Sequence, residues 1–269
     1  MKEYLIAFDS DGCVFDAMEP KHRLCFEPAA VKVFGLEKIE HEFLELWNKI
    51  NLYSKTRGVN RFLGLSLIFD RMREMGHELP DTGNFKQWIS QTKALSEAAL
   101  KEYITKKAPN NNELIKIAKW SEEVNRLTKE ISDDIKPYGN AYETISKAAK
   151  SADVAVVSSA GSDIIKEEWT KYSLFDFVSE LCGQERGTKA ECLGFLKAKG
   201  YKSVLMVGDA PGDMEAAIST GSLFYPIIPG QEEWSWTELK EVILWDFFSG
   251  KYQNDNKYLK EFERVILCE

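Results

Sequence analysis

The stretch that most constrains the fold is a short apolar run near the start of the chain that ends in closely spaced acids. Residues 4–8 read Tyr-Leu-Ile-Ala-Phe, and Asp9, Ser10, Asp11 and Gly12 follow them. An apolar run of this length, closed by a glycine, predicts a buried strand that ends in a tight loop. Side chains alternate along an extended backbone, so Asp9 and Asp11 can face one site only where the loop bends around it.

The two acids themselves indicate a bound cation. Carboxylates that share a site repel each other, and each raises the pKa of the other unless a cation lies between them. Mg²⁺ takes oxygen ligands and would relieve this repulsion. The pattern therefore predicts a metal site that includes Asp9 and Asp11, with an acidic turn after an ordinary strand as the alternative.

The composition narrows the class of protein. At 269 residues and 44% hydrophobic content, the chain can form about two domains, or one domain with a large insertion. Its net charge of −8 argues against nucleic acid or an anionic membrane as the main partner. We see no signal peptide, and no apolar run long enough to span a membrane.

The cysteines agree with an intracellular location. Their number is odd and their spacing matches no zinc motif. They are Cys13, Cys25, Cys182, Cys192 and Cys268. We interpret them as free thiols in a reducing compartment, and we expect a cytoplasmic protein.

Residues 17–136 show the periodicity of helices rather than of strands. Phe43, Leu44, Trp47 and Ile50 recur at the spacing of one helix face. Similar patterns predict helices around residues 62–72, 85–89, 99–103 and 114–127, the last with Asn111 or Asn112 as its N-cap. The region is therefore expected to be an inserted helical domain.

From residue 137 onward the pattern alternates between strand and helix. Strands are expected at 154–157, 175–181, 204–207, 223–225 and 227–228, with helices at 141–150, 164–172, 189–199 and 214–220 between them. Such alternation predicts a parallel sheet with helices on both faces, a Rossmann-like α/β core made of residues 1–16 and 137–269. A helical tail covers about 233–269, with a polar turn at 254–256 and a last helix at 258–267.

Polar residues follow three of the expected strands at their carboxyl ends. Asp9, Ser158 and Asp209 each come directly after a strand. Ligands of such sheets bind beyond the carboxyl ends of the strands, so we expect these three residues to share a site.

The first motif resembles that of the haloacid dehalogenase-like hydrolase superfamily, in which a hydrophobic strand precedes Asp-x-Asp-Gly. The resemblance implies that Asp9 is a nucleophile that forms an aspartyl-phosphate and that Asp11 is the general acid/base. The second acid favours phosphate over halide, because a halide leaving group needs no proton. Cys13 stands where that family commonly has Thr or Val, and its small apolar side chain suits the position.

Further stretches are similar to the family's other motifs, in the required order. Ser158 matches a hydroxyl that binds a phosphoryl oxygen, and Ser159 beside it is a second candidate substrate contact. Lys189 matches the lysine that neutralises the phosphoryl group, with Arg186 as a competitor. Asp209 and Asp213 match Gly-Asp-x-x-x-Asp, which implies that Asp209 binds Mg²⁺ and that Asp213 holds a metal-bound water or Lys189. Each of these residues also has an alternative interpretation without a functional role: a serine in an ordinary loop, a solvated surface lysine, or an acid that stabilises a helix N-terminus.

The helical insertion corresponds in position to the cap domain of C1-type members. Its segment 53–61 concentrates cations beside a glycine between two expected helices. We expect Arg57, Gly58 and Arg61 to contact the part of the substrate that does not react, against the alternative of a solvated basic helix start.

These features together predict a Mg²⁺-dependent phosphatase that acts on a small phosphorylated metabolite. Two alternatives remain: a phosphomutase of the beta-phosphoglucomutase type, which uses the same residues, and a catalytically silent phosphate-binding or scaffold protein. Both Asp9 and Asp11 are present, which speaks against the silent protein. The substrate and the oligomeric state do not follow from the sequence.

Overall fold

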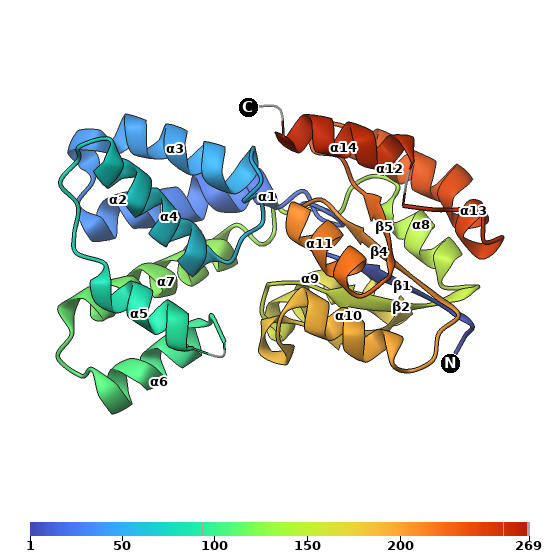
Figure 1. The fold of residues 1–269 in the computed structure, drawn as a ribbon, viewed down its shortest axis with the longest axis horizontal. Coiled ribbons are helices and arrows are strands. Elements are labelled where there is room, and N and C mark those ends of the chain that lie inside the picture. The colour runs from blue at the N-terminus through green and yellow to red at the C-terminus, as the bar shows by residue number, and fades with distance from the viewer. Residues whose placement is uncertain (93, 255, 268–269) are drawn as a thin grey trace. The chain divides into compact units, whose positions relative to one another are not determined.

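The chain consists of two compact units. The computed structural model describes residues 1–92, 94–254 and 256–267 (Figure 1). One unit combines Met1–Ala17 with Ile135–Glu269, and the other is Met18–Asp134. We call them the core unit and the helical unit. Asp255 of the expected polar turn and Cys268 among the expected thiols lie outside the described residues.

The core unit is built on a five-stranded sheet in which every pairing is parallel, in the order β3-β2-β1-β4-β5. The strands are β1 (Tyr4–Phe8), β2 (Ala152–Val157), β3 (Val178–Cys182), β4 (Ser203–Gly208) and β5 (Leu223–Pro226). The run that opens the chain forms β1, the central strand, and Leu5 to Phe8 are fully buried because helices cover both faces. The predicted Rossmann-like α/β core is confirmed.

Helices follow the strands as the alternation predicted. They are α8 (Ala141–Ala148), α9 (Ser162–Lys171), α10 (Lys189–Lys197), α11 (Pro211–Ser219), α12 (Glu232–Glu238), α13 (Leu244–Phe248) and α14 (Lys257–Leu267). A π-helical turn, Leu239–Ile243, joins α12 to α13, and a 3₁₀ turn, Gln184–Arg186, precedes α10.

The two faces of the sheet are covered by different helices. Leu5 and Ala7 of β1 share one hydrophobic cluster with side chains of α10, α11 and α14. Phe8 points to the other face, where its ring stacks on Trp236 of α12 with 5.9 Å between centroids. Side chains alternate along β1, and those on its two faces contact different helices of the tail. The tail helices α14 and α12 therefore lie on opposite sides of the sheet.

Two of the expected strands differ from the structure. Residues 175–181 were expected to be extended throughout, but Phe175–Phe177 forms a 3₁₀ turn and β3 begins only at Val178. The turn is closed by the N–H of Phe177, which donates to the carbonyl of Leu174. Residues 227–228 lie beyond β5, although Ile227 still donates to Gly208. An apolar run in the sequence does not by itself show at which residues the hydrogen-bonded pairing of a strand starts and ends.

The helical unit confirms the predicted all-helical insertion. Its helices are α1 (Met18–Lys21), α2 (Glu27–Phe34), α3 (Glu40–Leu52), α4 (Arg61–Glu74), α5 (Gly83–Gln91), α6 (Glu97–Lys107) and α7 (Asn112–Glu130), with a π-helical turn at His22–Phe26 and a 3₁₀ turn at Glu37–Ile39. Within the described part of this unit there is no strand. The side chain of Asn111 caps α7 by accepting from the N–H of Leu114, as predicted.

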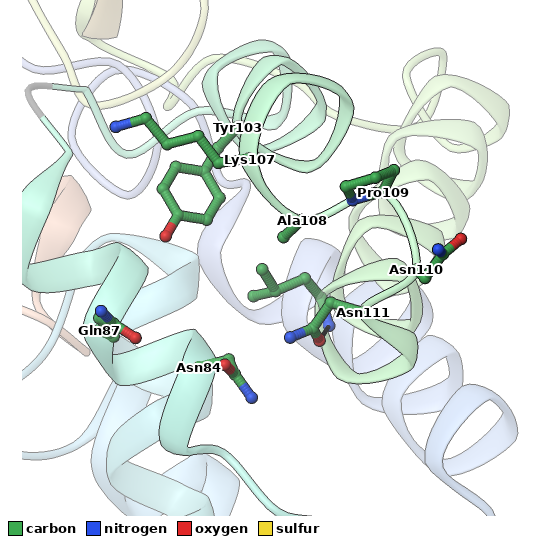
Figure 2. A pocket seen from close by; sticks show the side chains of 9 residues that line it. Asn84, Gln87, Tyr103, Lys107, Ala108, Pro109, Asn110 and Asn111 are labelled. Atoms are coloured by element: carbon green, nitrogen blue, oxygen red, sulfur yellow. Dashed lines mark hydrogen bonds between the residues drawn. The ribbon is translucent and has the colours of Figure 1, made fainter.

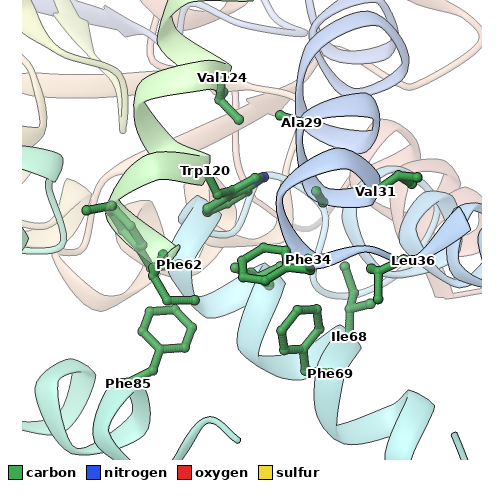
Figure 3. Close-up of a cluster of buried hydrophobic side chains, with 14 of the residues drawn as sticks. Ala29, Val31, Phe34, Leu36, Phe62, Ile68, Phe69, Phe85, Trp120 and Val124 are labelled. Atoms are coloured by element: carbon green, nitrogen blue, oxygen red, sulfur yellow. The ribbon is translucent and has the colours of Figure 1, made fainter. Parts of the chain in front are cut away.

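A hydrophobic core of its own holds the helical unit together. Figure 3 shows Phe62, Phe69, Phe85 and Trp120, from α4, α5 and α7, packed with aliphatic residues of α2. These aromatic side chains are fully buried and meet largely edge to face. Among the described residues, none of the helices in either unit is long and apolar enough to cross a lipid bilayer.

The chain leaves the core unit and re-enters it at neighbouring positions. The N–H of Asp16 donates to the carbonyl of Lys136 over 3.0 Å, and the N–H of Tyr138 donates to Val14 over the same distance. Phe15 and Pro137 form an antiparallel bridge between these pairs. The two connections to the helical unit therefore start side by side.

Candidate active site

The candidate site lies at the carboxyl edge of the three central strands. Because β1 pairs with both β2 and β4, the residues that follow these strands are neighbours along one edge. Those residues are Asp9, Ser158 and Asp209, the three that the sequence placed at strand ends. This is the edge at which parallel α/β sheets bind ligands.

Three acids meet at this edge. Asp9, Asp209 and Asp213 each have a carboxylate oxygen within 4.8 Å of the others. They are 5%, 1% and 0% exposed. Three carboxylates so close together in a buried place repel one another strongly and require positive charge nearby. Within the described residues, Asp11 is not part of this group, and its side chain is half-buried.

Lys189 supplies that positive charge from the first turn of α10. Its Nζ lies 2.7 Å from Oδ2 of Asp9 and 2.6 Å from Oδ1 of Asp213. The competing cation, Arg186, is exposed and lies 3.5 Å from Glu180, with its guanidinium over the ring of Phe195. Lys189 is therefore the cation that reaches the acids.

Local signals in the sequence explain why α10 starts at Lys189. Gly187 has φ +116°, a conformation that L side chains rarely adopt, and it turns the chain into the helix. The hydroxyl of Thr188 then accepts from the N–H of Glu191, while the carboxylate of Glu191 accepts from the N–H of Thr188. This capping box fixes the first turn and thus the starting direction of the Lys189 side chain.

The pKa values of the pair reflect burial and mutual charge. Burial raises the pKa of Asp213 to about 7, because Lys189 offsets only part of the desolvation and of the repulsion from Asp9 and Asp209. For Lys189 burial works to lower the pKa, but the charges of Asp213 and Asp9 outweigh it and hold the pKa well above its ordinary value. Lys189 is therefore charged at every physiological pH.

Asp213 is held by the start of α11 as well as by Lys189. Its Oδ2 accepts from the N–H of Ala210 at 3.1 Å. Pro211 occupies the first turn of α11, where a backbone N–H would have no partner within the helix, so the missing N–H of proline costs nothing. Gly208 lets the carboxylate lie against the end of β4, since a Cβ there would come within 2.4 Å of the carboxyl carbon of Asp213.

The loop after β1 is tightly hydrogen-bonded to itself. The N–H of Ser10 donates to Oδ1 of Asp9 at 2.7 Å, and its carbonyl accepts from the N–H groups of Val14 and Phe15. Gly12, with φ +80°, donates to Phe15. These bonds fold the backbone over within a few residues. The bend does not bring Asp11 into the acid cluster of Asp9, although the sequence predicted a metal site that includes both.

The donor set fits a hard divalent cation. Buried carboxylates offer oxygen atoms only, and the described cysteines and histidines contribute nothing to this group. Mg²⁺ is bound in proteins by one or two carboxylates together with water and substrate oxygens. The described acids thus form a cluster that could hold a metal ion.

Ser158 and Ser159, the candidate contacts on β2, have different surroundings. Ser158 is buried at the strand end, where its N–H donates to the carbonyl of Cys182 and its Oγ accepts from the N–H of Ala160. Ser159 is exposed in the loop before α9. The hydroxyl of Ser158 can still donate a hydrogen bond, as a phosphoryl oxygen would require.

The other three residues expected to contact substrate lie in the helical unit, in the connection from α3 to α4 and at the start of α4. Arg57 is only 5% exposed, and its Nη1 donates to the carbonyl of Leu52 at 2.9 Å. Gly58 has φ +70°. Arg61 is the first residue of α4, where it donates to Asn125 and covers the ring of Phe26. The segment is therefore packed into the unit rather than solvated.

Sequence reasoning missed two residues near these arginines. Lys21 and His22 are both buried, and burial together with the charges of Arg57, Arg61 and Lys21 lowers the pKa of His22 to about 3. The positive charges of these three cations therefore act on one neutral imidazole. The periodicity of apolar residues could not reveal that Lys21 and His22 interact with the two arginines, because the pairs lie far apart in the sequence.

A separate cavity of about 490 Å³ lies in the helical unit. Figure 2 shows Asn84 and Gln87 of α5 facing Tyr103 and Lys107 of α6 across it. The wall is completed by the α6–α7 connection and the first turn of α7. Among the residues that line it there is no carboxylate, so this cavity is distinct from the acid cluster.

Comparisons with known proteins agree with this geometry. The sequence model of a family described as haloacid dehalogenase-like hydrolase matches residues 74–225, which include Ser158, Lys189, Asp209 and Asp213. A comparison with curated proteins finds no match.

Two solved structures are similar to this chain, and the first of them, with a TM-score above 0.5, shares its fold. One, a predicted phosphoglycolate phosphatase from Haemophilus somnus, is 16% identical over 84% of this chain and 86% of its own, with a TM-score of 0.51. Another, a predicted phosphatase from Clostridium acetobutylicum, is 13% identical over 84% of each chain, with a TM-score of 0.46.

Proposed function

Because the chain belongs to the haloacid dehalogenase-like hydrolase family, we propose that it is a Mg²⁺-dependent phosphatase that hydrolyses a small phosphorylated metabolite. The observation that carries the proposal is the cluster of Asp9, Asp209 and Asp213, in which Asp9 and Asp213 contact the ammonium of Lys189. Phosphoryl transfer needs a nucleophile, cations for the phosphoryl oxygens and a proton donor for the leaving group. The residues at this edge of the sheet can supply each of these.

Asp9 is the proposed nucleophile. Its carboxylate oxygen attacks phosphorus, the bond from phosphorus to the ester oxygen breaks, and an aspartyl-phosphate forms. Asp11 gives a proton to the departing alkoxide and later takes one from the water that attacks the aspartyl-phosphate. Inorganic phosphate leaves and Asp9 is again a carboxylate. The bond from Ser10 N–H to Oδ1 fixes one oxygen of Asp9 and leaves Oδ2 on the side of Lys189.

Lys189 and Ser158 are the proposed ligands of the phosphoryl oxygens. The ammonium of Lys189 offsets the negative charge of the substrate, and Asp213 holds that ammonium in place over 2.6 Å. Asp9, Asp209 and Asp213 would hold the Mg²⁺ ion, with Asp209 as its main ligand. Asp11, expected from the sequence as a further ligand, lies outside the clustered acids and keeps only the role of general acid/base. When bound, the ion neutralises charge on the phosphoryl group and orients it.

The helical unit is the proposed source of selectivity. The positive charges that Lys21, Arg57 and Arg61 bring to one part of this unit favour a substrate with a second anionic group away from the phosphate. Ser159 is proposed as a weaker contact, since it is exposed beside Ser158. A small carboxylated phosphate ester, such as the phosphoglycolate named for the Haemophilus protein, is the first substrate to test.

The test of the reaction is hydrolysis of p-nitrophenyl phosphate and of phosphoglycolate with defined metals. We expect activity with Mg²⁺, loss with EDTA, and no recovery with Ca²⁺, whose larger ligand number disturbs the geometry of attack. Asp9→Asn removes the nucleophile and should abolish turnover, whereas Asp163→Asn, at an exposed acid of α9, should not. Full activity in metal-free buffer contradicts the proposal. Transfer of phosphate to a second sugar position indicates a mutase, and binding of phosphate without turnover indicates a silent protein.

The test of selectivity compares arginine variants on the two esters. Arg57→Ala and Arg61→Ala should lower kcat/KM for the true substrate by roughly tenfold to a thousandfold, while activity on p-nitrophenyl phosphate changes little. Lys55→Ala is the matched control, because this cation is exposed in the same segment. An unchanged ratio of the two activities in both arginine variants places selectivity elsewhere.

A further inference from the structure

Two buried tryptophans hold the loop that carries Asp9, and we propose that Trp169 and Trp236 are positioning residues for the nucleophile. This inference rests on the proposed function, because it concerns the step in which Asp9 attacks phosphorus. The two indoles come from α9 and α12, and Trp236 lies beyond residues 74–225, which the family model matches.

Each indole donates one hydrogen bond to the loop. Nε1 of Trp169 donates to Oγ of Ser10 at 3.0 Å, and Nε1 of Trp236 donates to the carbonyl of Cys13 at 2.9 Å. Both tryptophans are fully buried, as are Ser10 and Cys13. Asp11 and Gly12, the apex of the loop, lie between the two bonded residues. The loop is thus fixed on either side of its apex.

The other attachments of the loop reach β4. The carbonyl of Val207 accepts from the N–H of Asp9 at 2.9 Å and from Sγ of Cys13 at 3.4 Å. These bonds tie the start and the end of the loop to one point of the sheet. The two indoles add contacts to the loop from separate helices, α9 and α12.

Packing alone does not account for these tryptophans. Phe8 stacks on Trp236 with only 11° between the ring planes, and the ring of Phe15 meets that of Trp169 edge to face. A phenylalanine could fill either place with similar apolar contact, but it has no N–H to donate. The indole N–H matters because a buried carbonyl or hydroxyl that loses its donor lets the loop adopt other positions.

Positioning of this kind affects the rate of the chemical step. A nucleophile must lie in line with the bond that breaks, and a shift of about 1 Å can cost roughly a hundredfold in rate. Substrate affinity depends instead on groups such as Lys189. Loss of an indole donor should therefore lower kcat and leave KM almost unchanged.

The test uses the full-length protein with Trp236→Phe and Ser10→Ala. The first variant keeps the ring against Phe8 and removes the donor, and the second removes the acceptor of Trp169. Rapid-quench single turnovers with saturating Mg²⁺ measure the rate at which Asp9 is phosphorylated. We expect this rate to fall roughly tenfold to a hundredfold in each variant, with KM within about twofold of the wild-type value.

Tyr225→Phe is the matched control. It removes a buried hydroxyl that donates to the carbonyl of Ser235 at 2.7 Å, next to Trp236 in α12 but away from the loop. It should lower Tm without slowing phosphorylation of Asp9. The Tm of every variant is measured alongside, so that a rate loss can be separated from a loss of folded protein.

The outcomes separate this inference from the proposed function. If the wild-type protein hydrolyses esters and both loop variants phosphorylate Asp9 within about twofold of its rate, the inference is wrong and the function stands. Rate losses in all three variants that follow their Tm values also overturn it. If the wild-type protein has no Mg²⁺-dependent activity on any ester, the function itself fails. Should Trp236→Phe not fold, Ser10→Ala decides.

Discussion

At the scale of single residues, the site depends on which carboxylates form ion pairs with the ammonium of Lys189. Asp9 and Asp213 both contact its ammonium, whereas Asp11 lies outside the clustered acids. That difference matches two different roles, a nucleophile that must be charged and an acid that must carry a proton at one stage.

Substitutions of the two acids of the first motif should therefore impair different steps of the reaction. Asp9→Asn should show no phosphoenzyme with any ester. Asp11→Asn should be slow with alkyl phosphates, whose leaving oxygen needs a proton, and much less impaired with p-nitrophenyl phosphate. Rates across a series of leaving groups check this, and equal losses for both variants at every leaving-group pKa would contradict the roles.

Gly208→Ala should abolish activity although it adds one methyl group. The new Cβ would lie 2.4 Å from the carboxyl carbon of Asp213, so the acid or the strand end must move away from Lys189. Gly194→Ala is the control, because a Cβ there meets nothing within 4 Å, and inside α10 it should stabilise the protein by about 0.5–1 kcal/mol. Steady-state kinetics and Tm check both variants. A Gly208→Ala protein with normal kcat would show that Asp213 need not be fixed.

Much of the site was predictable at this scale, because its residues sit at strand ends and helix starts that local patterns mark. Asp9, Ser158 and Asp209 follow apolar runs, and the capping pattern after Gly187 marks the start of α10 at Lys189. The tryptophans that hold the loop could not be predicted. Trp169 and Trp236 look like ordinary core residues, and their partners lie far away in the sequence.

At the scale of elements, buried titratable groups make the helical unit sensitive to pH. His22 stacks on Phe26 and accepts from Nε1 of Trp47 at 2.8 Å, so it is held neutral. Burial, with help from Arg57, Arg61 and Lys21, lowers its pKa to about 3 from 6.5. The contribution of His22 to stability is complete above pH 6.5 and is lost as the pH falls toward 3, since only the unfolded chain binds the proton in that range.

His22→Gln should remove this pH dependence. The amide still offers an acceptor to Trp47 but does not titrate. We expect the difference in unfolding free energy between wild type and variant to shift by about 2–3 kcal/mol between pH 7 and pH 4.5, with the wild type losing more. Denaturant titrations followed by tryptophan fluorescence measure it, and parallel curves at all pH values would contradict the assignment.

Glu27, in the first turn of α2, makes stability depend on pH in the opposite direction from His22. Burial raises its pKa to about 7, with Arg23 opposing, and among the described residues none donates to its Oε1. Its favourable contribution is present at low pH and is lost as the pH rises through 7. Glu27→Gln should therefore stabilise the protein by about 1 kcal/mol or more at pH 8 and little at pH 5. Glu102→Gln, at an exposed ion pair of α6, should change stability little at either pH.

The type of each element was easier to predict than its ends. Helix periodicity and alternating runs indicated both units, but β3 starts at Val178 because the 3₁₀ turn before it is closed by a bond to Leu174. The segment around Arg57 was expected to contact substrate, with a solvated basic helix start as the alternative. Its guanidinium is instead turned inward to the carbonyl of Leu52, which composition alone does not show.

At the scale of the whole molecule, the helical unit is a self-contained insertion. It has its own aromatic core, and the chain leaves and re-enters the core unit at Asp16 and Lys136, which are hydrogen-bonded to each other. Residues 18–134 expressed alone should therefore unfold cooperatively, with a blue-shifted tryptophan emission that denaturant removes. As a control, Trp120→Phe should weaken that transition by replacing a fully buried indole with a smaller ring, which leaves a cavity in the unit. A fragment without a cooperative transition would show that the unit needs the core unit to fold.

The adjacent connections also bear on the order in which the chain folds. β1 lies at the start of the chain, while its partner β2 begins only at Ala152, so the pairing of β1 with β2 must close a very long loop. Closing an unfolded loop of this length costs about 4 kcal/mol of chain entropy. If the insertion folds first, its two ends are already joined and the effective loop becomes short. Substitutions that destabilise the helical unit should therefore slow the folding of a sheet that they never touch, and so delay assembly of the acid cluster.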